Sequence, residues 1–150
     1  MYASRVTGVF RCLLATTLLA ACRVSMASCE NGHPGVQKEF RDSKVVFVGS
    51  VISSKNVSSP DDPSGVDYTI YSLKVERPFK GKTERVVKVS SENTTSRFPM
   101  DTGKSYLVFL YNYGDGYFVD NCGNSGEELE SKSAIEEIEH LRASGSTVRK

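Results

Sequence analysis

Six side chains could support metal or redox chemistry: four cysteines and two histidines. They are Cys12, Cys22, Cys29, Cys122, His33 and His140. Zinc sites need clustered thiolate and imidazole ligands, usually at short spacings such as Cys-x-x-Cys or His-x-x-x-His. Neither spacing occurs in this chain. We therefore expect no metal ligand and no cofactor.

The sequence also lacks the arrangements that activate a catalytic nucleophile. Serines are frequent, but none lies in a Gly-x-Ser-x-Gly motif, and two histidines offer few acid–base groups. The acidic runs at 127–130 and 136–139 are typical of a solvated helix face rather than of a cation site. Asp115, between two glycines, is typical of a turn. We expect no catalytic residue, and a protein that is not an enzyme.

The first 27 residues have the features of an export signal. A short n-region carries Arg5 and Arg11 and no acidic residue, and the apolar stretch 12–21 that follows is too short to span a bilayer. A buried N-terminal helix is the alternative. It is less favoured because the segment has no polar face that could meet solvent.

Two processing sites fit this signal about equally well. Leu19–Cys22 matches a bacterial lipobox, in which residues 1–21 are removed and Cys22 is lipidated. Ser25-Met26-Ala27 has the small-x-small pattern of ordinary signal cleavage, which removes residues 1–27. In the second case Cys22 is only an apolar residue near the end of the signal.

Either cleavage leaves a chain of single-domain length, with residues 28–145 as the domain and 146–150 as a disordered tail. Removing the two or three arginines of the signal from 19 basic residues leaves a net charge near −1 or −2 against 18 acidic residues. This balance gives no polybasic attraction to nucleic acid or anionic lipid. We expect no nucleic-acid partner, and membrane contact only through a lipid anchor at Cys22.

Two unmodified cysteines, Cys29 and Cys122, remain under either processing scheme. In an exported protein such a pair most simply forms one disulfide, the alternative being two separate thiols. The bridge would close a loop over most of the domain. The chain-entropy model then gives it a contribution of roughly 4 to 5 kcal/mol.

Strand patterns dominate the middle of the chain. Five segments are rich in β-branched and aromatic residues, namely 44–52, 68–76, 86–90, 104–113 and 117–120. Gly49 predicts a bulge or bend in the first of them, and the Ser-, Pro- and Asp-rich residues 53–67 predict a long flexible loop. The aromatic residues of the strands should fill the core, namely Tyr68, Tyr71, Tyr106, Phe109 and Tyr111.

The end of the chain changes to a helical period. Ser133 and Glu136 match a capping box, apolar residues then recur on one helical face, and Gly145 should end the helix. Near the N-terminus, a short amphipathic turn ends at Phe40. Together these patterns predict an all-β fold, a five-stranded OB-fold-like barrel with a short N-terminal helix and a C-terminal helix.

Four segments of the mature chain also follow the pattern of a known family. Cys29 lies four residues before His33-Pro34, and an amphipathic turn and an apolar strand follow up to Gly49. Val75–Gly81, Thr102–Phe109 and Tyr117–Cys122 come next in order. Their sequence resembles netrin-like domains, including the tissue inhibitors of metalloproteinases. The resemblance covers most of the mature chain and implies an OB-type barrel in an exported protein.

In those inhibitors the mature chain begins Cys-x-Cys, and the α-amino group and carbonyl oxygen of the first cysteine chelate the zinc ion of the protease. By the resemblance, Cys29 takes the position of the second cysteine and Ala27 that of the first. The partner of the first cysteine would lie between Ser91 and Gly103, where the sequence has no cysteine. The resemblance thus implies a Cys29–Cys122 disulfide. The second disulfide, which holds the zinc ligands rigid in those inhibitors, has no counterpart in this sequence.

The resemblance also implies a contact surface made of the loop 53–67 and the N-terminal segment Cys29–Gly35. The expected partner-binding residues are Ser28, Cys29, Glu30, Asn31, His33 and Pro34. We expect an exported binding module whose ligand is another protein, either periplasmic or extracellular, or lipid-anchored to the outer envelope. Two alternatives stay open: an inhibitor of zinc metalloproteases acting through its N-terminal segment, and a structural envelope lipoprotein module.

Overall fold

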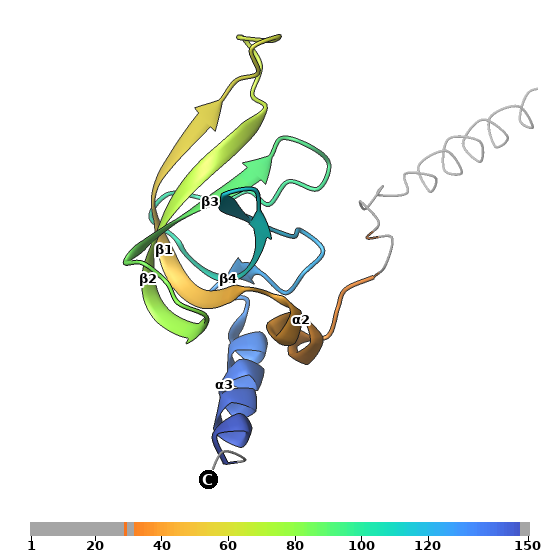
Figure 1. The fold of residues 1–150 in the computed structure, drawn as a ribbon, viewed down its shortest axis with the longest axis vertical. Coiled ribbons are helices and arrows are strands. Elements are labelled where there is room, and N and C mark those ends of the chain that lie inside the picture. The colour runs from red at the N-terminus through yellow and green to blue at the C-terminus, as the bar shows by residue number, and fades with distance from the viewer. Residues whose placement is uncertain (1–28, 30–31, 148–150) are drawn as a thin grey trace, which may run out of the picture.

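The computed structural model describes Cys29 and residues 32–147 (Figure 1). The predicted signal segment with Cys22, and the predicted contact residues Ser28, Glu30 and Asn31, lie outside the described residues. The elements in chain order are α2 (Val36–Asp42), β1 (Val45–Val57), β2 (Tyr68–Lys80), β3 (Val86–Glu92), β4 (Ser105–Tyr113), β5 (Gly116–Val119), β6 (Gly126–Glu127) and α3 (Lys132–Thr147).

Five strands close into a barrel. The hydrogen-bonded order is β1-β2-β3-β5-β4, and β1 pairs again with β4 to complete the circle. All pairs are antiparallel except β3 with β5, which run parallel. The predicted all-β, OB-fold-like barrel with a short N-terminal helix and a C-terminal helix is confirmed. The two-residue β6, which extends the sheet beside β4, was not predicted.

The first part of β1 and the middle of β4 are buried on both faces, which explains the apolar runs Val45–Val48 and Tyr106–Leu110. Val45 and Phe47 of β1 point into the barrel, whereas Val46 and Val48 point out toward the helices. The same alternation divides β4, whose Leu107 and Phe109 face the helices. A strand reads as a continuous apolar run when both of its faces are covered.

The two helices cover one end of the barrel (Figure 1). Ile135 and Ile138 of α3 are buried against the outward faces of β1 and β4, and Val36 and Phe40 of α2 join the same cluster. The opposite, inner cluster is filled partly by a connection rather than by a strand. Phe98, in the connection 93–104, packs into the barrel interior against the Tyr106 ring, 6.2 Å between centroids.

Three of the five aromatic residues predicted in the core are buried there: Tyr71, Tyr106 and Phe109. Tyr68 and Tyr111 are only partly buried, so the prediction was wrong for them. The reason is register. Tyr111 follows Leu110 on β4 and therefore points to the outer face, beyond the part of that face that the helices cover.

The loop predicted at 53–67 is shorter than expected. β1 continues to Val57, and residues 53–57 pair with the first residues of β2, from Ser53 with Ser72 to Val57 with Tyr68. Only residues 58–67 form the connection. The polar composition of 53–57 is explained by their exposure, because this β1–β2 arm, whose β2 residues also pair with β3, extends beyond the barrel (Figure 1).

The ends of α3 also differ from the prediction. The helix begins at Lys132, and the carbonyl oxygen of Ser131 accepts from the Ile135 amide at 3.0 Å. Ser133 therefore lies inside the first turn and is not the N-cap. The helix continues through Gly145 to Thr147, two residues into the segment predicted as a tail. A glycine near a helix end costs only about 1 kcal/mol and does not by itself stop the helix.

The bulge predicted at Gly49 is confirmed. The β1–β2 register shifts between Val48 and Gly49. A Cβ atom at Gly49 would lie 2.6 Å from the Lys74 carbonyl oxygen and 2.8 Å from the Phe47 ring. No side chain fits in that space, so glycine lets β2 approach β1 closely where the strand bends.

Lys80 fixes the position of α2 against the barrel. Its ammonium group donates to the carbonyl oxygens of Phe40, Arg41 and Ser43, each at 2.7 Å. These carbonyls lie at the C-terminal end of α2, where the helix leaves acceptors unpaired and where the helix dipole favours a cation. Partial burial lowers the pKa of Lys80.

Replacing Lys80 with methionine should lower the free energy of unfolding by about 1.5 to 3 kcal/mol. The apolar stem is kept, but three charge-assisted hydrogen bonds at the end of α2 are lost. Urea unfolding at pH 7 measures the effect. The matched control Lys82→Met, at an exposed position, should change stability by less than about 0.5 kcal/mol. Equal effects of the two substitutions would contradict the role given to Lys80.

Candidate functional site

The N-terminal segment is joined covalently to the loop that follows β5. Cys29 and Cys122 form a disulfide across 93 residues, with their Cα atoms 5.7 Å apart. The predicted pairing is therefore confirmed. A disulfide of this kind is typical of proteins in an oxidising compartment.

Asn124 forms a second, non-covalent clamp on the same segment. Its side-chain amide donates to the Pro34 carbonyl oxygen at 2.8 Å and to Glu39 Oε2 at 2.6 Å. Its backbone amide donates to the same Glu39 oxygen at 2.6 Å. One residue thus binds the N-terminal segment and α2 together, next to the disulfide.

Glu39 is the most unusual polar residue of the site. Only 1% of its surface is exposed, and within the described residues Oε1 has no hydrogen-bond partner of good geometry. Gly123 lies directly against Oε1, so that a Cβ at this glycine would overlap the oxygen. Buried carboxylates without full hydrogen bonding are costly, which makes this site a strained one.

Burial raises the pKa of Glu39, although the two hydrogen bonds from Asn124 oppose the shift. The negative charge of Asp120 raises the pKa further, and the Tyr111 hydroxyl lies close enough to favour the carboxylate. Burial and the nearby Glu39 charge in turn raise the pKa of Tyr111. Desolvation outweighs the hydrogen bonds here, because the charged form loses water on every side.

A hollow of about 480 Å³ lies over this cluster. Its lining includes Cys29 and Pro34, the aromatic rings of Tyr111 and Phe118, and the charged side chains of Lys38 and Asp42. Lys38 and Asp42 pair with each other at 2.7 Å. The hollow therefore combines aromatic side chains with side chains of both charges, which suits a polar protein surface.

The structure gathers only part of the predicted contact surface. Cys29 and Pro34 line the hollow, and His33 is exposed beside it. The loop 58–67 lies far away, at the tip of the β1–β2 arm (Figure 1). The described N-terminal residues and this tip therefore belong to separate surfaces.

Sequence reasoning missed Glu39 and Asn124. A signal was present for Glu39, because Val36, Glu39 and Phe40 fall on one helical face at i, i+3 and i+4, so that the acidic residue interrupts an apolar stripe. For Asn124 no local pattern was available. Its partners lie 85 and 90 residues away in the sequence.

The described residues hold no group of three or more His, Cys, Asp or Glu side chains that could bind a metal ion. In the same part of the chain, no helix is long and apolar enough to cross a membrane. Compared with protein-family models and with curated proteins, the sequence gives no match.

Replacing both Cys29 and Cys122 with serine should lower the free energy of unfolding by about 2 to 5 kcal/mol, because the unfolded chain regains the freedom that the bridge removes. The urea midpoint of the variant, compared with the oxidised protein, gives the value. Reducing the native protein should produce a similar loss. If the oxidised protein and the double variant unfold at the same midpoint, the bridge does not stabilise the fold.

Glu39→Gln should change how stability depends on pH. Because the native pKa of Glu39 is raised, the folded state binds the proton of this acid more tightly than the unfolded state does. The protonated acid therefore stabilises the fold fully below the ordinary pKa of 4.5, and this contribution is lost as pH rises through the native pKa. The variant has no such proton to lose. Its stability relative to the native protein should therefore increase from pH 4.5 to pH 8, as measured by urea unfolding.

The control for this experiment is Glu137→Gln, at an exposed position on α3. This variant should follow the pH dependence of the native protein. A constant stability difference between Glu39→Gln and the native protein at all pH values would show that Glu39 does not titrate in this range.

Proposed function

We propose that this protein is an exported, netrin-like binding module whose ligand is another protein, met at the cell envelope or outside the cell. Three features support the proposal. They are the features of an export signal in residues 1–27, the disulfide that suits an oxidising compartment, and the resemblance of four sequence segments to netrin-like domains.

The observation that carries the proposal is that the chain is held at two points, Cys29 and Pro34, on either side of the exposed His33. Cys29 is bonded to Cys122, and the Pro34 carbonyl oxygen accepts from Asn124. His33, between these two points, is exposed to solvent. A residue whose neighbouring chain is already held loses little conformational entropy when it binds, so His33 and Pro34 are favourable contact residues.

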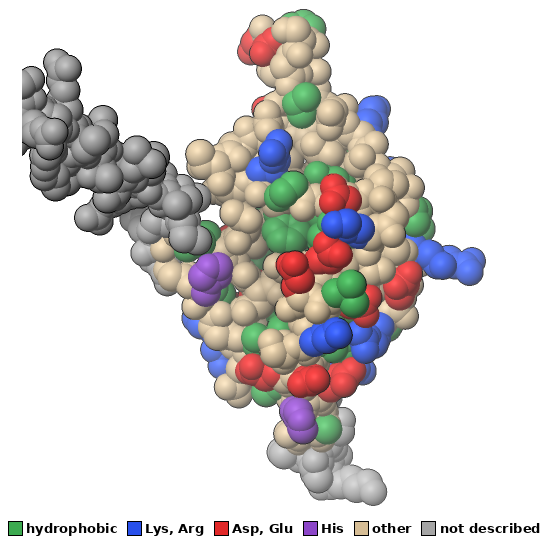
Figure 2. All heavy atoms as spheres, turned by 180° about the vertical axis from the view of Figure 1, so that it is seen from behind, with side chains coloured by type: hydrophobic (Ala, Val, Ile, Leu, Met, Phe, Trp, Pro, Cys, Tyr) green, Lys and Arg blue, Asp and Glu red, His purple; other side chains and the backbone are tan. Residues whose placement is uncertain are grey.

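The surface charge supports a protein ligand over a nucleic acid. Acidic and basic side chains are intermixed around a group of apolar side chains on the face that Figure 2 shows. Nucleic-acid binding depends on a field of positive charge that neutralises phosphates. Apolar side chains surrounded by charges of both signs are instead typical of a protein interface.

Inhibition of a zinc metalloprotease is the second candidate. The bridge to Cys122 favours it, because the bond holds the backbone at Cys29 against the barrel. The start of the mature chain decides between this candidate and a structural lipoprotein module. Intact mass measurement would identify either a diacylated Cys22, which would block N-terminal chelation, or a free amine close to Cys29.

Site-specific photocrosslinking tests the proposed function. A photoreactive amino acid at His33 and one at Lys38, on two sides of the hollow, should each crosslink the same protein in the native host. The same group at Glu137, on the exposed face of α3, should not. The crosslinked partner, once purified, should bind the native chain in calorimetry. It should bind the Cys29→Ser, Cys122→Ser variant at least about tenfold more weakly, because Cys29 is then no longer held against the barrel.

The proposal fails if neither position near the hollow yields a crosslink that Glu137 lacks, or if the captured protein does not bind in purified form. The inhibitor candidate has its own readout. Inhibition of a zinc metalloprotease that disappears when the N-terminal amine is acetylated would favour that candidate.

A further inference from the structure

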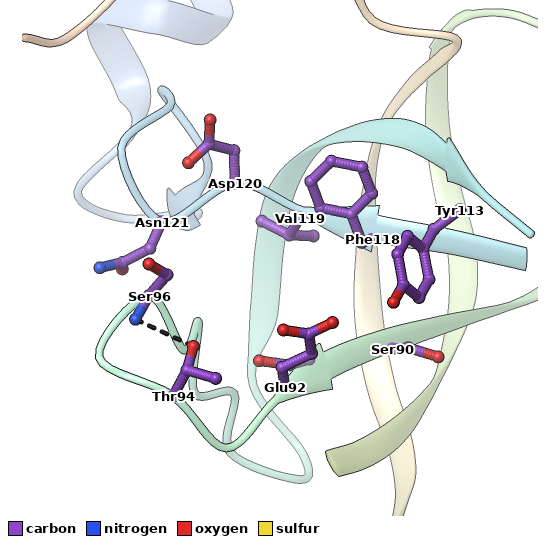
Figure 3. A pocket seen from close by; sticks show the side chains of 10 residues that line it. Ser90, Glu92, Thr94, Ser96, Tyr113, Phe118, Val119, Asp120 and Asn121 are labelled. Carbon is purple, nitrogen blue, oxygen red and sulfur yellow. Dashed lines mark hydrogen bonds between the residues drawn. The ribbon is translucent and has the colours of Figure 1, made fainter. Parts of the chain in front are cut away.

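A second hollow, of about 200 Å³, opens on the outer face of the barrel (Figure 3). It lies between the end of β3, the residues 94–96 and the β4–β5 hairpin. Parallel pairing of β3 with β5 places Ser90 beside Phe118, and antiparallel pairing of β4 with β5 places Tyr111 beside the same phenylalanine. Three strands therefore contribute to one small site.

Aromatic rings form one wall of this hollow. Phe118 stacks against Tyr111 at a centroid distance of 5.5 Å and meets Tyr113 edge-on at 5.9 Å. Tyr113 is 58% exposed, and only a few large apolar residues of the described chain are exposed to this degree. Tyr113 and Phe118 line the hollow, and Tyr111 packs against Phe118 without lining it, so Tyr113 and Phe118 offer a preformed, rigid platform to a ligand.

Carboxylates supply the polar side. Glu92 and Asp120 line the hollow, and no lysine or arginine of the described residues does so. Neither carboxylate forms an ion pair with a described residue. Figure 3 shows the Tyr113 hydroxyl turned toward the Glu92 carboxylate, and the hydrogen bond to Glu92, together with the Glu92 charge, raises the pKa of this tyrosine. Asp67 adds negative charge nearby.

We propose that this hollow binds a lysine or arginine side chain of the protein partner, between the rings of Tyr113 and Phe118 and the carboxylate of Glu92. A cation over an aromatic face is attracted by the ring electrons, and a carboxylate at the same site adds a charge-assisted hydrogen bond. Arginine fits best, because its flat guanidinium stacks on rings while its edge pairs with a carboxylate. The proposal rests on the proposed function and names what the partner must present.

The two hollows are neighbours, which links this site to the N-terminal segment. Phe118 and Asp120 line both of them. A partner that covers the Cys29–Gly35 segment can therefore place a basic side chain in the second hollow without a separate interface. Nucleic acid is disfavoured as the occupant, because Glu92 and Asp120 would repel its phosphates.

Titration of the ¹⁵N-labelled, disulfide-bonded protein with small probes tests this site. Nα-acetyl-arginine amide should give saturable shifts of the backbone amides of Ser90, Glu92 and Phe118. Nα-acetyl-citrulline amide, which has the same shape without the charge, should bind at least about tenfold more weakly. Glu92→Gln should weaken the binding of the arginine probe about five- to tenfold, whereas Glu84→Gln, at an exposed position outside this hollow, should not change it.

Any of four results would overturn the proposal. The first two are equal binding of the arginine and citrulline probes, and no saturable shift with either. The third is tighter binding, at the same amides, of a carbohydrate probe (a chitin oligomer) or a nucleic-acid probe (an oligothymidylate). The fourth is unchanged arginine binding by Phe118→Ala, once its spectrum shows a native fold. If the arginine probe fails while His33 still crosslinks a partner that binds, only the cation site is wrong. If the crosslinks fail as well, the proposed function is wrong.

Discussion

The burial of Val45–Gly49, the first part of β1, on both faces is the constraint on which the rest of the molecule depends. β1 is hydrogen-bonded to β2 on one edge and to β4 on the other, so it closes the barrel. Val45 and Phe47 fill the interior while Val46 and Val48 hold the helices. Only Ser43 and Lys44 separate this strand from α2, so the position of β1 sets that of Glu39. A one-residue slip of β1 would bring a residue with a side chain to the place where only Gly49 fits against the Lys74 carbonyl oxygen, and this fixes the register.

The candidate site is held from both ends of the domain. α2 is placed by β1 and Lys80, whereas the loop 120–124 is placed by β5 and returns to α2 through Asn124. The Cys29–Cys122 disulfide then joins the N-terminal segment to the loop 120–124. Such a closed arrangement can keep the buried carboxylate of Glu39 in place, because Asn124 and the disulfide hold the surrounding backbone. Gly123 is needed in the same arrangement, since any side chain at this position would displace Oε1 of Glu39.

Much of the fold could be predicted from the sequence because its signals are local. β-branched runs, the bulge at Gly49 and the Cys29–Cys122 pair all rest on residue type and spacing, and the structure confirms them. The errors arose where tertiary pairing overrode composition. Polar residues 53–57 became strand because β2 pairs with them, and Ser133 lost the N-cap position because the helix begins one residue before it.

The site itself was less predictable, for a physical reason. The contacts of Asn124 with Glu39 and of Phe118 with Tyr113 depend on which strand faces which, and sequence periodicity does not contain that information. The sequence analysis assigned Tyr111 to the core, where an aromatic residue gains most from burial, yet Tyr111 packs with Phe118, and Phe118 with Tyr113, on the outside. A protein that needed these residues only for stability would gain more by burying them. The proposed cation site would give a reason for their stacking beside the carboxylates of Glu92 and Asp120.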